Sequence, residues 1–227
     1  MQDMIINKVF IEVRYPDSLM FNDMSALQSI CNSLISIVPN RNFDKANNFL
    51  IITSEDDSFR VTISNNRLIL DHDQPNDYGK FKELSNEVLR IVTEKLMIDY
   101  VTRIGMRSLR GIEKTNEYEA CEYICSNYAN KVKTNSNMIG EMVGFGINMS
   151  FERKDYRINL ALMPNSLQTI TVTPAGSSET KRCEVQVDTD VYLNSVNDIP
   201  RLYNNFIDDV IRINENEIVQ FIRKMSE

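Results

Sequence analysis

The sequence has little of the material that common catalytic sites require. Its 227 residues include one histidine, His72, seven glycines and no tryptophan. A single histidine excludes HExxH proteases, three-histidine zinc sites and the iron site of two histidines and one carboxylate. Neither the GxGxxG fingerprint nor a P-loop occurs in the chain, so classical nucleotide binding is not expected. The sequence therefore predicts no catalytic residue, no metal site and no cofactor.

Charge and hydropathy are those of an ordinary globular protein. Apolar residues make up 42% of the chain and charged residues 25%, with a net charge of -7. An acidic protein has no global attraction for nucleic acid or for anionic lipid. No apolar run approaches the ~20 residues that cross a bilayer, and the first ten residues lack the features of a signal peptide. We expect a cytoplasmic protein without a membrane partner, and nucleic acid is not an expected partner.

The four cysteines are then expected to be reduced thiols. Cys121 and Cys125 are four residues apart, which places them on one face of a predicted helix together with Tyr118 and Tyr128. Because no second ligand pair would complete a zinc site, this pattern favours buried core thiols over a metal or redox pair.

Residues 1–115 read as a β-α-β-β-β-α-β half. Alternating apolar and polar residues predict strands at residues 9–15, 49–53, 59–63, 67–70 and 100–113. Apolar residues at helical spacing predict helices from 24 to 38 and from 78 to 97, capped by Asp23 and Asp77. The polar stretch 40–48 is predicted to be a loop.

Residues 116–227 read as an α-β-β-β-β-α half. A helix at 117–129 and a polar linker at 130–137 precede four predicted strands, at residues 143–152, 156–163, 167–173 and 182–193. Turns are expected at 153–155 and 164–165, and a loop at 174–181. A long helix from Asp198 closes the chain; it either projects in part from the core or breaks at the polar cluster 214–216. The sequence thus predicts an α+β fold of mainly antiparallel sheets in two interlocked halves or one continuous domain, with helices packed on the sheets.

The densest basic cluster is VTRIGMRSLRGIE, at residues 101–113. In a strand, Arg103, Gly105 and Arg107 share one face, so two guanidinium groups flank a gap without a side chain. Arginine suits planar recognition of carboxylate or phosphate, which makes an anion site one interpretation.

A matching acidic pair occurs in VQVDTDVYL, at residues 185–193, where Asp188 and Asp190 share one strand face. The more conservative interpretation is that Arg103 or Arg107 forms cross-strand ion pairs with these aspartates, each worth roughly 0.2 to 1 kcal/mol. The same polar face would receive further side chains from two other strands. The candidate ligand-binding residues are Arg14, Arg103, Arg107, Asp188 and Asp190, and the further polar side chains are Glu12, Arg157 and Asn159.

A second acidic cluster, LDHDQPND, surrounds His72 with Asp71, Asp73 and Asp77. Carboxylates two residues apart could hold a divalent cation, but Pro75 stands where an EF-hand loop needs a ligand. A capped, solvated turn is the preferred interpretation.

Four segments in order, VFIEVRY, RIGMRSLRGI, VQVDTDVYL and LYNNFIDDVIRINENEIVQFI, resemble a sporadically distributed family of uncharacterised bacterial and archaeal proteins. The similarity covers nearly the whole length. The strand core of that family, arginine-hydrophobic-glycine-hydrophobic-arginine, matches Arg103, Gly105 and Arg107, and its late D-x-D matches Asp188 and Asp190. The resemblance implies an architecture and a prokaryotic or phage source, without an activity.

The absence of catalytic material favours a non-enzymatic binding or regulatory protein that acts through a polar sheet face or its terminal helix, on a protein partner or as a homodimer. The alternative is an enzyme or sensor for a small phosphorylated or carboxylate ligand held by Arg103 and Arg107. A third hypothesis, a phage-conflict or toxin-antitoxin component, comes only from the sporadic distribution of the family. Gene neighbours would best distinguish the three.

Overall fold

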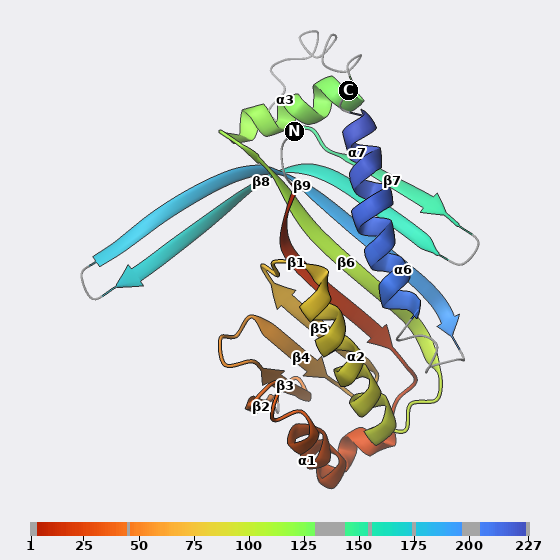
Figure 1. The fold of residues 1–227 in the computed structure, drawn as a ribbon. Coiled ribbons are helices and arrows are strands. Elements are labelled where there is room, and N and C mark those ends of the chain that lie inside the picture. Colours follow the sequence, from red (N-terminus) through yellow and green to blue (C-terminus); the bar gives the residue numbers. More distant parts are fainter. Residues whose placement is uncertain are drawn as a thin grey trace.

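A computed structural model gives the fold and describes residues 4–44, 46–129, 144–153, 156–173, 176–196 and 205–225. The protein is of the α+β class, with one antiparallel sheet of nine strands and helices packed on it (Figure 1). The strands lie in the order β2-β3-β4-β5-β1-β6-β9-β8-β7. They are β1 (Met4–Arg14), β2 (Asn40–Asp44), β3 (Phe49–Thr53), β4 (Phe59–Ile63), β5 (Arg67–Asp73), β6 (Val101–Lys114), β7 (Ile147–Glu152), β8 (Arg157–Thr173) and β9 (Gly176–Val196).

The helices α1 (Met24–Ser33), α2 (Tyr78–Lys95) and α3 (Glu117–Tyr128) begin where the sequence predicts them. The carboxylate of Asp23 accepts a hydrogen bond from the Ser25 amide at the start of α1, and Asp77 accepts one from the Gly79 amide at the start of α2, so both predicted caps are confirmed. No helix in the described ranges is long and apolar enough to cross a membrane. The helical segments are η1 (Leu19–Asn22), α1 (Met24–Ser33), α2 (Tyr78–Lys95), α3 (Glu117–Tyr128), α6 (Ile207–Arg212), η4 (Ile213–Ile218) and α7 (Val219–Met225).

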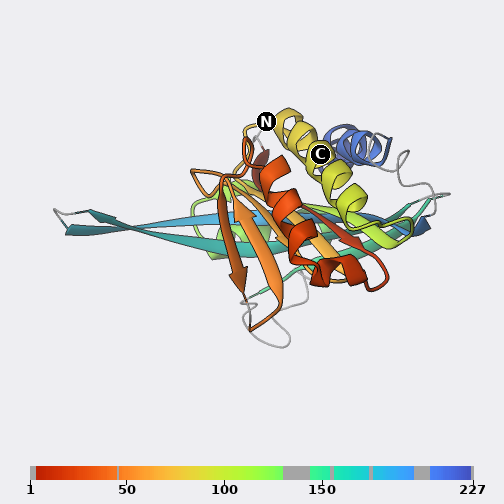
Figure 2. The ribbon, with the colours of Figure 1, turned by 90° about the horizontal axis from the view of Figure 1, so that it is seen from below.

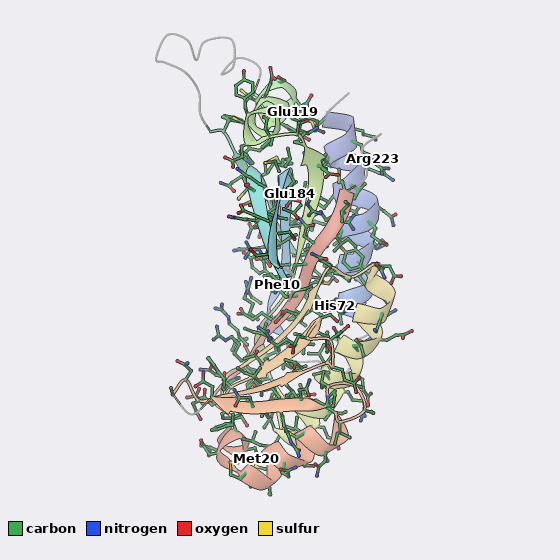
Figure 3. The ribbon with its side chains drawn as sticks, turned by 90° about the vertical axis from the view of Figure 1, so that its left-hand side faces the viewer. Phe10, Met20, His72, Glu119, Glu184 and Arg223 are labelled. Atoms are coloured by element: carbon green, nitrogen blue, oxygen red, sulfur yellow. The ribbon has the colours of Figure 1, made fainter. Side chains whose placement is uncertain are left out.

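The sheet has one helix-covered face and one helix-free face. In β1, Val9, Ile11 and Val13 are fully buried, whereas Glu12 and Arg14 alternate with them on the other side. Seen from below, helices α1 and α2 and the C-terminal helix lie on the same side of the strands (Figure 2), and in the edge-on view α2 and α7 again share one side (Figure 3). The core therefore lies between these helices and the sheet, which leaves the opposite face for polar side chains.

The two predicted halves are adjacent blocks of this one sheet. Strands from residues 1–115 form the block from β2 to β6, and strands from residues 116–227 form the block β9-β8-β7. The blocks join where β6 pairs with β9, from Val101 opposite Val196 to Lys114 opposite Cys183.

Three predictions about loops and strands are wrong. Asn40–Asp44 is an edge strand, because the free edge of β3 supplies backbone hydrogen bonds that no hydrophobic pattern reveals. The predicted turn at 164–165 is continuous strand, in which Pro164 pairs with Val185. Proline is tolerated there because β7 begins at Ile147, opposite Leu162, so β8 has no further strand of the described residues on that side beyond Leu162. Most of the predicted loop 174–181 belongs to β9, and the block holds three described strands in place of four.

The distal parts of β8 and β9 form a two-stranded arm. Beyond the ends of β7 and β6, the described residues of these two strands pair only with each other, from Leu167 opposite Arg182 to Thr173 opposite Gly176. This arm extends away from the rest of the sheet (Figures 1 and 2).

The C-terminal helix, Ile207–Met225, packs on the sheet and does not project from it. Six of its apolar side chains are buried, and the Phe221 ring meets the Phe151 ring of β7 edge to face at 5.8 Å. The helix stays continuous at 214–216 but widens into the π-helical segment η4, within which the buried Asn214 amide donates to the Val210 carbonyl. The predicted start at Asp198 and the predicted linker at 130–137 lie outside the described residues. The buried apolar side chains are Ile207, Val210, Ile213, Ile218, Val219 and Ile222.

Candidate binding site on the helix-free face

The structure places the predicted arginine and aspartate rows on adjacent strands of the helix-free face. Arg107 of β6 lies opposite Asp190 of β9, and Gly105 lies opposite Tyr192. Neighbours fill the space above Gly105: an added Cβ would lie 3.2 Å from Cβ of Tyr192, 3.3 Å from Nη2 of Arg103 and 3.3 Å from Oδ1 of Asp190. The gap predicted between the two arginines is therefore occupied by an ion pair.

Both arginines have carboxylate partners across the strands. Arg107 holds Asp188 with two hydrogen bonds, one of 2.7 Å from Nε to Oδ1 and one from Nη2 to Oδ2. Arg103 bridges two carboxylates, at 3.1 Å from Oε1 of Glu12 and 3.0 Å from Oδ2 of Asp190. The predicted cross-strand ion pairs are therefore present.

Glu12 is the centre of a second, arginine-rich group. Nε of Arg14 donates to its Oε1 at 2.6 Å, and Nη1 of Arg67 lies 3.9 Å from its Oε2. With Arg103, three guanidinium groups surround one carboxylate. Arg14 thus belongs to this group around Glu12. It does not reach Asp188 or Asp190.

A groove of about 340 Å³ opens beside Arg107 on the helix-free face. Residues of four adjacent strands line it, and every second residue of each strand points its side chain to this side. Asn148 and Ser150 were not predicted, although their alternation with apolar residues in β7 was the available signal. The lining residues are Arg107, Asn148, Met149, Ser150, Asn159, Leu160, Ala161, Asp188 and Asp190.

Burial changes the protonation behaviour of the groove. Loss of hydration raises the pKa of the Asp190 carboxyl, and the positive charges of Arg103 and Arg107 offset this only in part. The hydrogen bond from Arg107 to Asp188 raises the pKa of the guanidinium and keeps it charged. Of the two aspartates that line the groove, Asp190 is therefore the one whose negative charge is less fully offset by arginine.

The sequence pattern did not indicate a buried polar cluster that lies at the base of the arm. Glu184 is only 1% exposed although it belongs to the helix-free face, and its position is labelled in Figure 3. Its carboxylate accepts hydrogen bonds from Asn7 at 2.8 Å, from Asn165 at 3.2 Å and from Arg182 at 3.0 Å. Asn7 reaches it from a β-bulge in β1, and a bulge commonly redirects a side chain. Gly111 leaves the space that this carboxylate fills.

On the helix-covered face, Arg110 is a buried arginine beside a tyrosine. It is 8% exposed, and its Nη2 donates to the Tyr78 hydroxyl at 3.0 Å, which also lies 2.7 Å from Oγ of Ser108. Its Nε is buried and has no hydrogen-bond partner among the described residues. The guanidinium lies 5.3 Å from the Tyr78 ring centroid, which offsets some of the desolvation cost.

We expect Arg110→Met to leave the free energy of unfolding within about 1 kcal/mol of the wild type or to raise it. Replacing a buried charge by an apolar side chain of similar volume is often neutral or stabilising. Urea unfolding followed by circular dichroism measures the change. Tyr78→Phe is the matched variant, and it should cost about 1 kcal/mol because it removes the hydroxyl that joins Arg110 to Ser108. A loss above about 2 kcal/mol in Arg110→Met would contradict this account.

His72 lies in β5 and not in a turn, so that part of the prediction is wrong. It is 8% exposed, and its ring meets the Phe81 ring of α2 edge to face at 6.4 Å. The alternation of β5 turns it toward the helices, which the polar residues around it in the sequence concealed.

The acidic residues near His72 have partners within the fold. Nζ of Lys8 lies 3.0 Å from Asp71 and 2.9 Å from Asp73, while Asp77 caps α2. These carboxylates are thus used in ion pairing and capping, of which the sequence predicted only the cap at Asp77.

The cysteines are buried free thiols. Cys121 and Cys125 lie on the buried side of α3, and burial raises the pKa of the Cys121 thiol. This is the core environment that their spacing predicted.

The fold and site together define an α+β protein with a polar, charge-paired sheet face. No protein-family model and no curated protein matches the chain.

Proposed function

We propose that this protein is a non-catalytic binding protein and that the helix-free face of the sheet is its binding surface. The observation that carries the proposal is the groove of about 340 Å³ on that face, lined by polar and charged side chains from β6, β9, β8 and β7. The terminal helix, the other candidate surface, has six of its apolar side chains buried against the core. A cytoplasmic location and a prokaryotic source are part of this proposal.

The alternative of a small anionic ligand has weaker support. Arg107 is already held by Asp188 with two hydrogen bonds, and Arg103 is shared by Glu12 and Asp190. An anion would have to displace these carboxylates, since a bidentate arginine-carboxylate pair leaves few free donors.

Cross-linking in cells tests the proposed surface. Asn159 is exposed in the groove, so Asn159→Arg should block the surface and reduce recovery of cross-linked partners at least about tenfold, equivalent to 1.4 kcal/mol. Glu83→Arg, at an exposed position of α2, is the matched control and should leave recovery unchanged.

Equal recovery with both variants would contradict the proposal. A thermal-shift screen with nucleotides and phosphorylated metabolites tests the alternative: stabilisation that disappears in Arg107→Ala, with the fold intact, would favour the anionic ligand.

A further inference from the structure

The groove is large enough for one long side chain together with water. Its volume of about 340 Å³ corresponds to roughly ten water molecules at ~30 Å³ each. Asn148, Ser150 and Asn159 are exposed along its wall, and Oγ of Ser150 lies 2.9 Å from Oδ1 of Asn159. These groups can donate or accept hydrogen bonds.

The charges that line the groove are unbalanced. Two aspartates face a single arginine there, and that arginine uses its fork to hold both oxygens of Asp188. Asp190 receives Arg103 at Oδ2 only, and its Oδ1 has no hydrogen-bond partner among the side chains that the structure describes. Burial also raises the pKa of the Asp190 carboxyl, which a nearby cation would oppose.

We infer that this groove binds the cationic side chain, lysine or arginine, of a partner protein, with Asp190 as its counter-ion. The inference rests on the proposed function, since it names the chemistry of the partner that the helix-free face receives. It reverses the ligand charge of the alternative drawn from the sequence, because Arg103 and Arg107 are occupied by carboxylates, whereas Asp190 uses only Oδ2 in its ion pair with Arg103.

The neighbouring charges favour a protein over a free polyamine. Around Glu12, Arg14 and Arg67 face one carboxylate in addition to Arg103, which Glu12 shares with Asp190, so the surface beside the groove has the opposite imbalance. A partner with a basic and an acidic side chain complements both regions, whereas a polyamine complements only the groove. Charge complementarity of this kind sets specificity and association rate at interfaces.

Peptide titrations of the ¹⁵N-labelled protein test this inference. The probes are the blocked tetrapeptides Arg-Gly-Gly-Glu, Arg-Gly-Gly-Gln and Gln-Gly-Gly-Glu, and spermidine. We expect the amides of Asn148, Ser150, Asn159 and Asp190 to shift saturably with both arginine peptides, more tightly with Arg-Gly-Gly-Glu. The peptide without arginine should produce no shifts at these amides.

Asp190→Asn should weaken binding of Arg-Gly-Gly-Glu at least about tenfold, whereas Glu83→Gln on α2 should not change it. Thermal melts check that both variants fold. Equal binding by Gln-Gly-Gly-Glu, unchanged binding in Asp190→Asn, or spermidine binding as tightly as Arg-Gly-Gly-Glu would overturn the inference. If Asn159→Arg loses cross-linked partners while the arginine peptides do not bind, the proposed surface stands and the cationic partner is wrong. If Asn159→Arg has no effect on the partners, the proposed function itself fails.

Discussion

Glu184→Ala should lower the free energy of unfolding by about 3 to 5 kcal/mol, the range for breaking a buried charge pair by removing one partner. Glu184 is 1% exposed and accepts hydrogen bonds from Asn7, Asn165 and Arg182. Its removal takes one acceptor from each of these donors at the point where the arm leaves the sheet, and it leaves the Arg182 guanidinium without its carboxylate, although Asn165 keeps Gln186 and Arg182 keeps Asn7 as acceptors. Urea unfolding followed by circular dichroism measures the loss.

Gln186→Ala is the matched control, because Gln186 lies two residues further along the same face of β9 and accepts a hydrogen bond from Asn165. It should cost no more than about 1 kcal/mol. A similar loss in both variants would show that the buried carboxylate has no special role.

The same pair of strands allows a double-mutant cycle. A Cβ at Gly111 would lie 2.0 Å from Oε2 of Glu184, so Gly111→Ala forces the carboxylate to move. We expect a loss of about 1 to 3 kcal/mol in the wild type, as for other overpacked sites. In the Glu184→Ala background the clash is removed, and the loss should fall below about 1 kcal/mol. Additive losses would contradict the steric account.

Phe81→Ala should also destabilise the protein by about 3 to 5 kcal/mol, as large-to-small changes of buried aromatic residues do. Phe81 is fully buried where α2 meets the sheet, and its ring contacts the rings of Phe59 at 6.3 Å and His72 at 6.4 Å. The cavity would open beneath α2, because the rings on β4 and β5 are fixed by strand pairing. Thermal and urea unfolding measure the effect.

Phe151→Ala is the control for Phe81→Ala. Phe151 is 39% exposed and also pairs edge to face with a helix residue, Phe221. Because water already reaches this ring, its loss should cost about 1 kcal/mol. Equal losses would mean that the burial of the ring does not determine the size of the effect.

The sequence determined the elements whose signals are local. Periodicity placed β1, β3, β4, β6 and α2 near their observed positions, and the side-chain chemistry of Asp23 and Asp77 identified two helix starts. Alternation along β6 and β9 also placed Arg103, Arg107, Asp188 and Asp190 on polar faces, because side-chain direction in a strand follows directly from residue spacing. Arg14 was assigned to the same face for this reason.

Tertiary structure alone decided what depends on neighbouring strands. β2 forms because β3 offers it a free edge. Pro164 continues a strand because the pairing of β8 with β7 stops at Leu162, two residues before the proline. Register decided that Arg107 holds Asp188 and that Arg103 is shared between Glu12 and Asp190. The sign of the unpaired charge in the groove depends on those partners. Residue alternation along the strands therefore fixed which charges the face carries. Strand order and register, which arise from contacts distant in sequence, decided which of these charges is left for a partner.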